Sequence, residues 1–220
     1  EWDVAANGYP EFNYRLNENG KLVSYGDAPG DYLTDVLANK GVGFINGSAN
    51  AGDPFMLEIA TFAPHSPFTP APRDAQDFPG LQVPRTPAFN AQNSNPPNWL
   101  AGRPPLTNAQ IATLDHNFRK RAQSVEAVDG MIGQIRATLA SRGLSQDTYI
   151  VFSSDNGFHM GDHRLLAGKT TAFDTDIGVP LIVVGPGVPA GRSVGRLAAN
   201  IDLRPTFGQL AGASVPSTVD

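Results

Sequence analysis

Apolar residues along the chain form one long periodic stretch and three short continuous blocks. In the long stretch they recur at intervals of three, four or seven, which predicts an amphipathic helix over residues 109–141. Thr107 and Asn108 can cap its first turn, and Gly143 is expected to end it. The short blocks have the length and composition of buried strands of a parallel sheet, and they lie at residues 54–60, 149–152 and 180–184.

Weaker patterns predict three more elements. A hairpin is expected from residues 13–16 and 21–24, because Asn19-Gly20 between them is a strong turn signal. Residues 31–39 have helical spacing, and Gly41 is expected to cap that helix. A last helix is predicted at residues 203–210. The order of strand, long helix, strand, loop and strand predicts an α/β fold with helices on the faces of the sheet.

Residues 69–105 show neither pattern and are rich in proline and asparagine. The stretch is too long for an ordinary connection between two elements. Two interpretations stay open. It is either a lid, substrate-facing loop or insertion packed on the surface, or a disordered linker.

Polar side chains follow the predicted strand at residues 149–152. Asp155, Asn156 and Gly157 come directly after it, and Lys169 lies in the loop before the next strand. Polar groups past the carboxyl end of a buried strand are where open α/β sheets bind ligands. The hypothesis is that Asp155 and Asn156 bind a metal ion and that Lys169 meets an anion. The alternatives are a plain turn and a solvated lysine.

Oxygen ligands of this kind suit calcium, magnesium or manganese rather than zinc. Two residues cannot hold such an ion alone, so other ligands must come from elsewhere. Among the histidines, His65 is the better functional candidate, because it lies between two prolines after a predicted strand and could protonate a leaving group or bind an anion. His159 and His163, read alone, are expected to be hydrogen-bonded structural residues.

Composition narrows the classes of function. The chain has 220 residues and a formal net charge of -5, which gives no electrostatic footprint for nucleic acid or an anionic membrane. It contains no cysteine, and no apolar stretch approaches the roughly 20 residues that span a bilayer. Both ends look cut, since the chain begins at Glu1 and stops at residues 217–220 without a cap. We therefore expect a part of a longer protein.

Several short motifs, taken together and in order, make the chain similar to a known family. They are Ser154-Asp155-Asn156-Gly157, Gly161, His163, Gly168-Lys169, Phe173-Asp174, Val179-Pro180-Leu181 and Gly185-Pro186-Gly187. Two further motifs precede them in collinear order, at residues 31–35 and 63–67. With these motifs the chain resembles the sulfatase family over nearly its whole length, in particular bacterial arylsulfatases and N-acetylglucosamine-6-sulfatases.

The resemblance implies an alkaline-phosphatase-like α/β/α sandwich with a mostly parallel central sheet. It implies that Asp155 and Asn156 ligate calcium and that Lys169 binds the sulfate and neutralises its charge. His65 matches the histidine that contacts the sulfate and assists the leaving oxygen. His163 lies in the family's Gly-x-His segment and is assigned a secondary contact with the substrate. The implied reaction is hydrolysis of an aryl or carbohydrate sulfate ester.

The chain departs from the family pattern in what it lacks. Sulfatases carry a Cys-x-Pro-x-Arg or Ser-x-Pro-x-Arg motif whose first residue becomes formylglycine, the nucleophile. Nothing in the sequence fits that motif, and residues 214–218 lack the arginine. The family's paired amino-terminal aspartates are also missing. The resemblance therefore implies that residues 1–220 are the carboxyl-side portion of a catalytic domain and are inactive alone.

Two rival functions remain. A phosphodiesterase or phosphonate hydrolase of the same superfamily often has histidine where Asn156 stands, so the asparagine favours a sulfatase. A non-catalytic protein that keeps the fold as a binding module is the other rival. Since most bacterial relatives are exported, the resemblance also implies a secreted or periplasmic protein.

Overall fold

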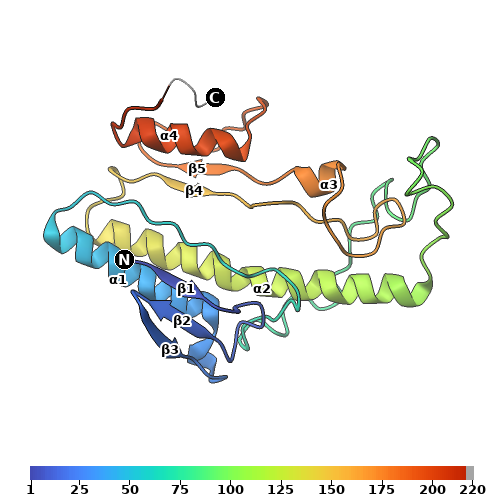
Figure 1. Ribbon diagram of the computed structural model, residues 1–220, viewed down its shortest axis with the longest axis horizontal. Helices are drawn as coiled ribbons and strands as arrows, with labels where there is room; N and C mark the ends of the chain where they lie inside the picture. Colours follow the sequence, from blue (N-terminus) through green and yellow to red (C-terminus); the bar gives the residue numbers. More distant parts are fainter. Residues whose placement is uncertain (217–220) are drawn as a thin grey trace.

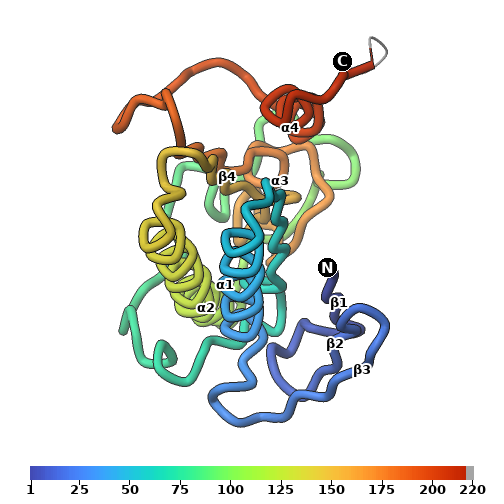
Figure 2. Tube along the Cα trace, turned by 90° about the vertical axis from the view of Figure 1, so that its left-hand side faces the viewer, coloured from blue at the N-terminus to red at the C-terminus, as the bar shows by residue number. Residues whose placement is uncertain are grey.

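Helices and strands are stacked in three layers in the computed structural model, which describes residues 1–216 (Figure 1). Helices α1 (Leu33–Ala51) and α2 (Asn108–Ser141) lie side by side in one layer. Strands β4 (Ile150–Phe152) and β5 (Ile182–Val184) form the middle layer, and α4 (Leu203–Leu210) covers their other face. Figure 2 shows the same order from the side. The uncapped end expected at residues 217–220 lies outside the described residues.

Helix α2 begins with a capping box. The Thr107 side chain accepts a hydrogen bond from Gln110 N at 3.3 Å, and Gln110 Oε1 accepts one from Thr107 N at 2.8 Å. The helix ends before Gly143, whose φ of 72° lies in the left-handed region that favours glycine. The predicted helix at residues 109–141 is confirmed, because both its end signals and its periodicity are local.

Helix α1 is longer than predicted. It continues to Ala51 and is capped by Gly52 with a φ of 72°, so the expected end at Gly41 is wrong. A Cβ atom at Gly41 would lie 2.8 Å from Ile59 Cδ1 and 3.2 Å from Ile135 Cδ1. Gly41 therefore lies within the helix, where Ile59 and Ile135 pack closely against it, and does not mark a turn.

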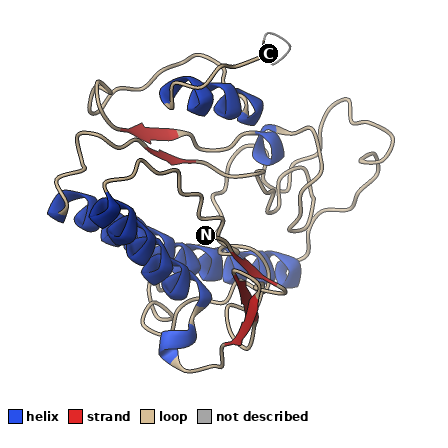
Figure 3. Ribbon diagram, turned by 60° about the vertical axis from the view of Figure 1, so that its left-hand side comes forward, coloured by secondary structure: helices blue, strands red, loops and turns tan. Residues whose placement is uncertain are grey.

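A small antiparallel sheet lies away from the central strands (Figure 3). Strands β2 (Arg15–Glu18) and β3 (Lys21–Ser24) form the predicted hairpin, with Asn19 and Gly20 at φ 51° and 96° in its turn. Strand β1 (Asp3–Ala5), which was not predicted, pairs with β2. A short 3₁₀ helix, Pro29–Asp31, leads from this sheet into α1.

The first turn of α1 is capped by a residue remote in sequence, Glu11. Its Oε2 accepts hydrogen bonds from Thr34 N at 3.0 Å and from Thr34 Oγ1 at 2.9 Å, whereas Tyr32 at the N-cap position offers no side-chain cap. The Glu11 side chain is 2% exposed. Burial outweighs these hydrogen bonds and raises the pKa of Glu11 to about 7.

This shift makes stability depend on pH. A folded-state pKa above the ordinary 4.5 means that the folded protein binds the proton more tightly, so stability is lost as pH rises toward about 7. Glu11→Gln cannot ionise and is expected to gain about 2 kcal/mol relative to the wild type between about pH 4.5 and about pH 6.5. Urea unfolding at several pH values checks this. Parallel stability curves of the two proteins would contradict the assignment.

The central strands differ from the expectation. Strand β4 pairs with β5 in antiparallel fashion, Val151 opposite Val183; β4 is half-buried and β5 is exposed. Residues 54–60 form no strand, because their backbone makes no hydrogen bond with any other described segment. The mostly parallel sheet stays a prediction, since β4 and β5 pair only with each other within residues 1–216.

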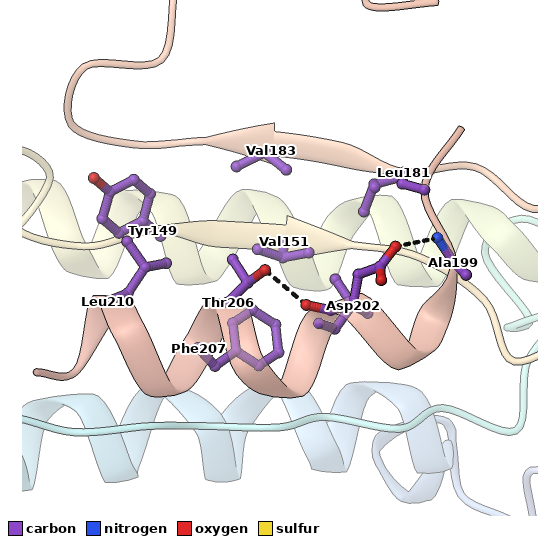
Figure 4. Close-up of a pocket in the computed structure, with 11 residues that line it drawn as sticks. Tyr149, Val151, Leu181, Val183, Ala199, Asp202, Thr206, Phe207 and Leu210 are labelled. Atoms are coloured by element: carbon purple, nitrogen blue, oxygen red, sulfur yellow. Dashed lines mark hydrogen bonds between the residues drawn. The ribbon is translucent and has the colours of Figure 1, made fainter. Parts of the chain in front are cut away.

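The two faces of β4 contact different layers. Phe152 packs against the α1–α2 layer through Val128 and Met131, while Val151 faces α4 across an apolar cavity of about 290 Å³ (Figure 4). A 3₁₀ turn, Asn200–Asp202, leads into α4, and Asp202 Oδ2 accepts a hydrogen bond from Ala199 N at 2.7 Å. The predicted helix at residues 203–210 is confirmed.

The segment at residues 69–105 contains no helix or strand but is fixed on α2. Arg85 forms an ion pair of 2.6 Å with Asp115, whose Oδ1 also accepts a hydrogen bond from Val83 N at 3.0 Å. Gln123 Nε2 donates to Asp77 O at 2.7 Å. These contacts support a packed insertion over a disordered linker. In the part of the chain that the structure describes, no helix is long and apolar enough to cross a membrane.

Candidate functional site

The loop that follows β4 bends at Asp155 and is held by hydrogen bonds from its own side chains. Ser154 Oγ donates to Asn156 O at 2.9 Å, Asn156 N donates to Asp155 Oδ1 at 2.8 Å, and Asn156 Nδ2 donates to Gly157 O at 2.8 Å. The Asp155 side chain is exposed. The loop presents a carboxylate and a carboxamide at the end of the strand, and no backbone hydrogen bond closes a turn within residues 153–157.

This loop is anchored to α3 (Asp174–Ile177), a short helix that precedes β5 in the chain (Figure 1). Gly157 N donates to Asp176 O at 2.8 Å, and Phe158 N donates to Thr175 O at 2.6 Å. A Cβ atom at Gly157 would lie 2.2 Å from Thr175 O, so only glycine permits this approach of the two backbones.

Lys169 is brought back to this loop by a two-residue bridge. His159 N donates to Gly168 O at 2.9 Å, and Gly168 N donates to His159 O at 3.0 Å. The half-buried Lys169 then places its Nζ 3.1 Å from Asn156 Oδ1. The structure thus brings together Asp155, Asn156 and Lys169, as the hypothesis of a metal pair beside an anion-binding cation requires.

A buried pair lies beneath this bridge. His159 Nδ1 is 2.9 Å and 3.0 Å from the two carboxylate oxygens of Asp176, and Asp176 Oδ2 accepts from Thr171 N at 2.8 Å and Thr171 Oγ1 at 2.7 Å. Burial opposes ionisation of Asp176, but the bonds from Thr171 and His159 outweigh it and hold the pKa of Asp176 below its ordinary value. The structural role predicted for His159 is confirmed. The sequence did not predict a role for Asp176, because no motif distinguishes it from three other aspartates in this part of the chain.

His65 lies in a separate loop and is exposed. Its Nδ1 is 3.0 Å from Ser66 O, and since a carbonyl oxygen only accepts, Nδ1 donates and Nε2 is left for a ligand. The Tyr9 ring lies 4.4 Å away, measured between centroids. Within residues 1–216 no hydrogen bond joins His65 to Asn156 or Lys169.

Arg121 of α2 contacts both the loop of His65 and the loop of Asn156, and no signal in the sequence marks it as a site residue. Its guanidinium carbon lies 4.3 Å from the centroid of the Phe158 ring and 5.8 Å from that of Phe68, and Nη1 donates weakly to Pro64 O at 3.4 Å. Burial lowers the pKa of Arg121. One half-buried cation therefore fixes the His65 loop against the loop of Asn156. In the helical pattern of α2, Arg121 lies next to the apolar stripe, at a position where a solvent-exposed residue is expected.

His163 makes its contacts with residues other than Lys169. Its N–H donates to Ala88 O at 2.8 Å, and its ring centroid lies 4.0 Å from that of Phe173. His163 Nδ1 is buried and has no hydrogen-bond partner within residues 1–216. It lines a cavity of about 250 Å³ together with residues 172–175.

The donor set was compared with the calcium that the resemblance implies. Asp155 and Asn156 offer the hard oxygen atoms that calcium prefers, so they fit part of a site. No group of three or more His, Asp or Glu side chains in the described range could hold a metal ion. The described residues thus offer two candidate ligands and not a complete set, and the calcium site stays a prediction.

The sequence of this chain is similar to a known family and to curated proteins. The family model described as "Sulfatase" matches residues 3–213. The N-acetylglucosamine-6-sulfatase of Homo sapiens is 39% identical over 220 residues, which covers 99% of this chain and 40% of the relative. Sulfatase ppz1 of Metarhizium majus is 39% identical, over 87% of this chain and 47% of the relative. The chain therefore spans less than half the length of these relatives.

Solved structures show the same fold. A protein in complex with its substrate D-glucosamine-2-N,6-O-disulfate matches with a TM-score of 0.81 at 22% identity, over 99% of this chain and 56% of that one. A phosphonate monoester hydrolase from Silicibacter pomeroyi matches with a TM-score of 0.72 at 23% identity, over 99% and 46%. Identities this low establish the fold alone. Together with the family match and the 39% identity to curated sulfatases, they show that the chain belongs to the sulfatase family.

Proposed function

We propose that this chain forms the sulfate-binding part of a sulfatase active site, and that the whole protein hydrolyses sulfate esters. The observation that carries the proposal is Lys169 Nζ at 3.1 Å from Asn156 Oδ1, beside the exposed carboxylate of Asp155. A half-buried ammonium neutralises a sulfate group far better than a solvated one does. The family membership supports the same assignment.

We further propose that Asp155 and Asn156 hold a calcium ion, with other ligands from outside the described residues. Bound calcium would supply positive charge at the sulfate oxygens. Lys169 would hold those oxygens in place. His65 in its doubly protonated form, with Nδ1–H held by Ser66 O, would donate the proton on Nε2 to the leaving oxygen. The formylglycine nucleophile of the family is expected outside residues 1–220, which contain no cysteine.

The substrate class we propose is a carbohydrate sulfate ester. It is supported by the names of the curated N-acetylglucosamine-6-sulfatases and by the sulfated glucosamine bound to a structural neighbour. We also propose that the protein is exported, supported by the extracellular sulfatase homologue of Drosophila melanogaster, which is 30% identical over 100% of this chain.

The experiment that tests this function compares esters on the full-length protein supplied with calcium. We expect release of sulfate from N-acetylglucosamine 6-sulfate or 4-nitrophenyl sulfate to exceed hydrolysis of an aryl phosphonate monoester by about 100-fold or more, about 3 kcal/mol in transition-state binding. Faster hydrolysis of the phosphonate would favour the phosphonate hydrolase instead. No turnover of any ester would favour a non-catalytic protein.

Asp155→Asn is expected to weaken calcium binding to the full-length protein by about tenfold or more, because the variant loses a charged ligand. Titration calorimetry with calcium checks this without reference to activity. Asp129→Asn, an exposed aspartate of α2, is the matched control and is expected to bind calcium like the wild type. Equal affinity of the Asp155 variant and the wild type would remove Asp155 from the metal site.

A further inference from the structure

Tyr9 lies beside His65, although the two residues are far apart in the sequence. The centroids of their rings are 4.4 Å apart, and the ring planes are tilted by 47°. Tyr9 is 46% exposed and His65 is exposed as well. The contact is therefore made at the surface, where His65 would meet a ligand.

The His65 side chain has few contacts that could fix its orientation. Within residues 1–216 its ring makes one hydrogen bond, from Nδ1 to Ser66 O at 3.0 Å, and one aromatic contact, with Tyr9. A hydrogen bond in an exposed loop is weakened by competition with water. An exposed side chain also changes rotamer rapidly unless packing restrains it. The Tyr9 ring supplies that packing.

Phe62 connects both rings to the core. Its ring centroid lies 4.9 Å from that of Tyr9, with the ring planes at 84°. Its carbonyl oxygen accepts a hydrogen bond from His65 N at 2.7 Å. The Phe62 side chain packs against the buried cluster that includes Leu16 and Leu33. Tyr9 and His65 are thus held by the same core residue.

The loop that carries Tyr9 is fixed at the start of α1. Gly8 O accepts from Glu11 N at 2.9 Å, and Glu11 O accepts from Leu33 N at 2.9 Å. A Cβ atom at the buried Gly8 would lie 2.5 Å from Leu33 Cδ2 and 2.5 Å from Phe62 Cδ2, so glycine permits the close approach of these segments. Tyr9 is therefore presented by a firmly packed loop, as the support of a functional side chain requires.

The orientation of His65 matters because a proton donor must come within hydrogen-bond distance of the leaving oxygen. Sulfate esters differ in how much they need this proton. The alkoxide that leaves from a sugar sulfate is strongly basic and needs a proton, whereas 4-nitrophenolate is a stable anion and leaves without one. Loss of the His65 orientation should therefore slow hydrolysis of the sugar ester and spare the 4-nitrophenyl ester.

We propose that Tyr9 is a positioning residue, whose ring holds the His65 imidazole in the rotamer that brings Nε2 to the leaving oxygen. The inference rests on the proposed function, which gives His65 its role as proton donor. Tyr9 acts through His65 and does not itself touch the reacting atoms. Its ring is the active part, since the ring makes the contacts with Phe62 and His65.

The test compares kcat/KM for N-acetylglucosamine 6-sulfate and 4-nitrophenyl sulfate, on the full-length protein supplied with calcium. Tyr9→Leu is expected to lower kcat/KM for the sugar ester by about five- to tenfold, the upper part of the range for loss of one aromatic pair. The value for 4-nitrophenyl sulfate should stay within about twofold of the wild type. His65→Ala is expected to show the same selectivity with a larger loss.

Two variants serve as controls. Tyr9→Phe keeps the ring and is expected to match the wild type on both esters. Trp2→Leu is the control for loss of an exposed aromatic residue, since Trp2 is 51% exposed and its backbone N–H donates to Asn19 Oδ1 at 2.9 Å. It should also match the wild type. Equal losses on the two esters in Tyr9→Leu, wild-type rates on both, or an equal loss in Tyr9→Phe would each overturn the inference.

A readout that does not depend on turnover separates this inference from the proposed function. Crystal structures of the full-length wild type and of Tyr9→Leu are expected to show one His65 rotamer in the wild type and a rotated or divided imidazole in the variant. The same single rotamer in both would overturn the inference. A wild type that hydrolyses no sulfate ester would refute the proposed function, while the two crystal structures would still show whether Tyr9 orients His65.

Discussion

Lys169→Ala in the full-length protein is expected to lower kcat/KM for sulfate ester hydrolysis by about 10² to 10³, a loss of roughly 3 to 4 kcal/mol in transition-state binding. The Lys169 ammonium lies 3.1 Å from Asn156 Oδ1. Its side chain is half-buried beside the loop that follows β4. Removing it leaves the charge of the sulfate without its lysine partner in a partly desolvated site. Initial rates at several substrate concentrations measure the effect.

The stability of that variant is expected to change little, since Lys169 makes a single side-chain hydrogen bond and forms no ion pair within residues 1–216. Lys120→Ala on α2, also half-buried, is the control for loss of a lysine and is expected to keep its activity. A Lys169 variant that turns over sulfate esters at the wild-type rate would contradict the assignment of this lysine.

Asp176→Ala is expected to cost about 3 kcal/mol of stability, because Thr171 N, Thr171 Oγ1 and His159 Nδ1 each lose a buried acceptor worth about 1 kcal/mol. Activity should fall as well, since the pair of His159 and Asp176 supports the bridge that carries Lys169 to Asn156. Urea unfolding gives the change in free energy, and KM against kcat shows whether the sulfate is still held.

Asp174→Ala is the matched control for stability, as it lies in the same short helix and is exposed. Its free energy of unfolding is expected to stay within about 0.5 kcal/mol of the wild type. Equal small losses in both variants would show that the buried pair does not hold this loop together.

Elements with signals inside a few residues could be predicted from the sequence. The capping box of α2 and the Asn19-Gly20 turn lie within their own segments, and both elements were placed correctly. Gly41 shows the limit of such signals, because a glycine packed against Ile59 and Ile135 inside a helix is indistinguishable locally from a cap. Residues 54–60 can form a strand only if another strand pairs with them, and a local sequence pattern does not show whether such a partner is present.

In the candidate site, too, residues with a local sequence signal could be predicted and residues that act through remote contacts could not. Asp155, Asn156 and Lys169 are singled out by their position after an apolar block, and the structure brings them together. Arg121 contacts residues 37 to 57 positions away, and Asp176 pairs with a histidine 17 positions away, so no motif marks them. Tyr9 and His65 meet only after the loop at residues 8–11 has folded onto the start of α1.

The central claim is that Asp155, Asn156 and Lys169 form one sulfate-binding site with calcium. A crystal structure of the full-length protein with its nucleophile replaced by alanine, calcium and N-acetylglucosamine 6-sulfate tests it most directly. We expect sulfate oxygens within hydrogen-bond distance of Lys169 Nζ and a metal ion ligated by Asp155 and Asn156. A sulfate group bound away from Lys169, or a metal ion held by other residues, would contradict it.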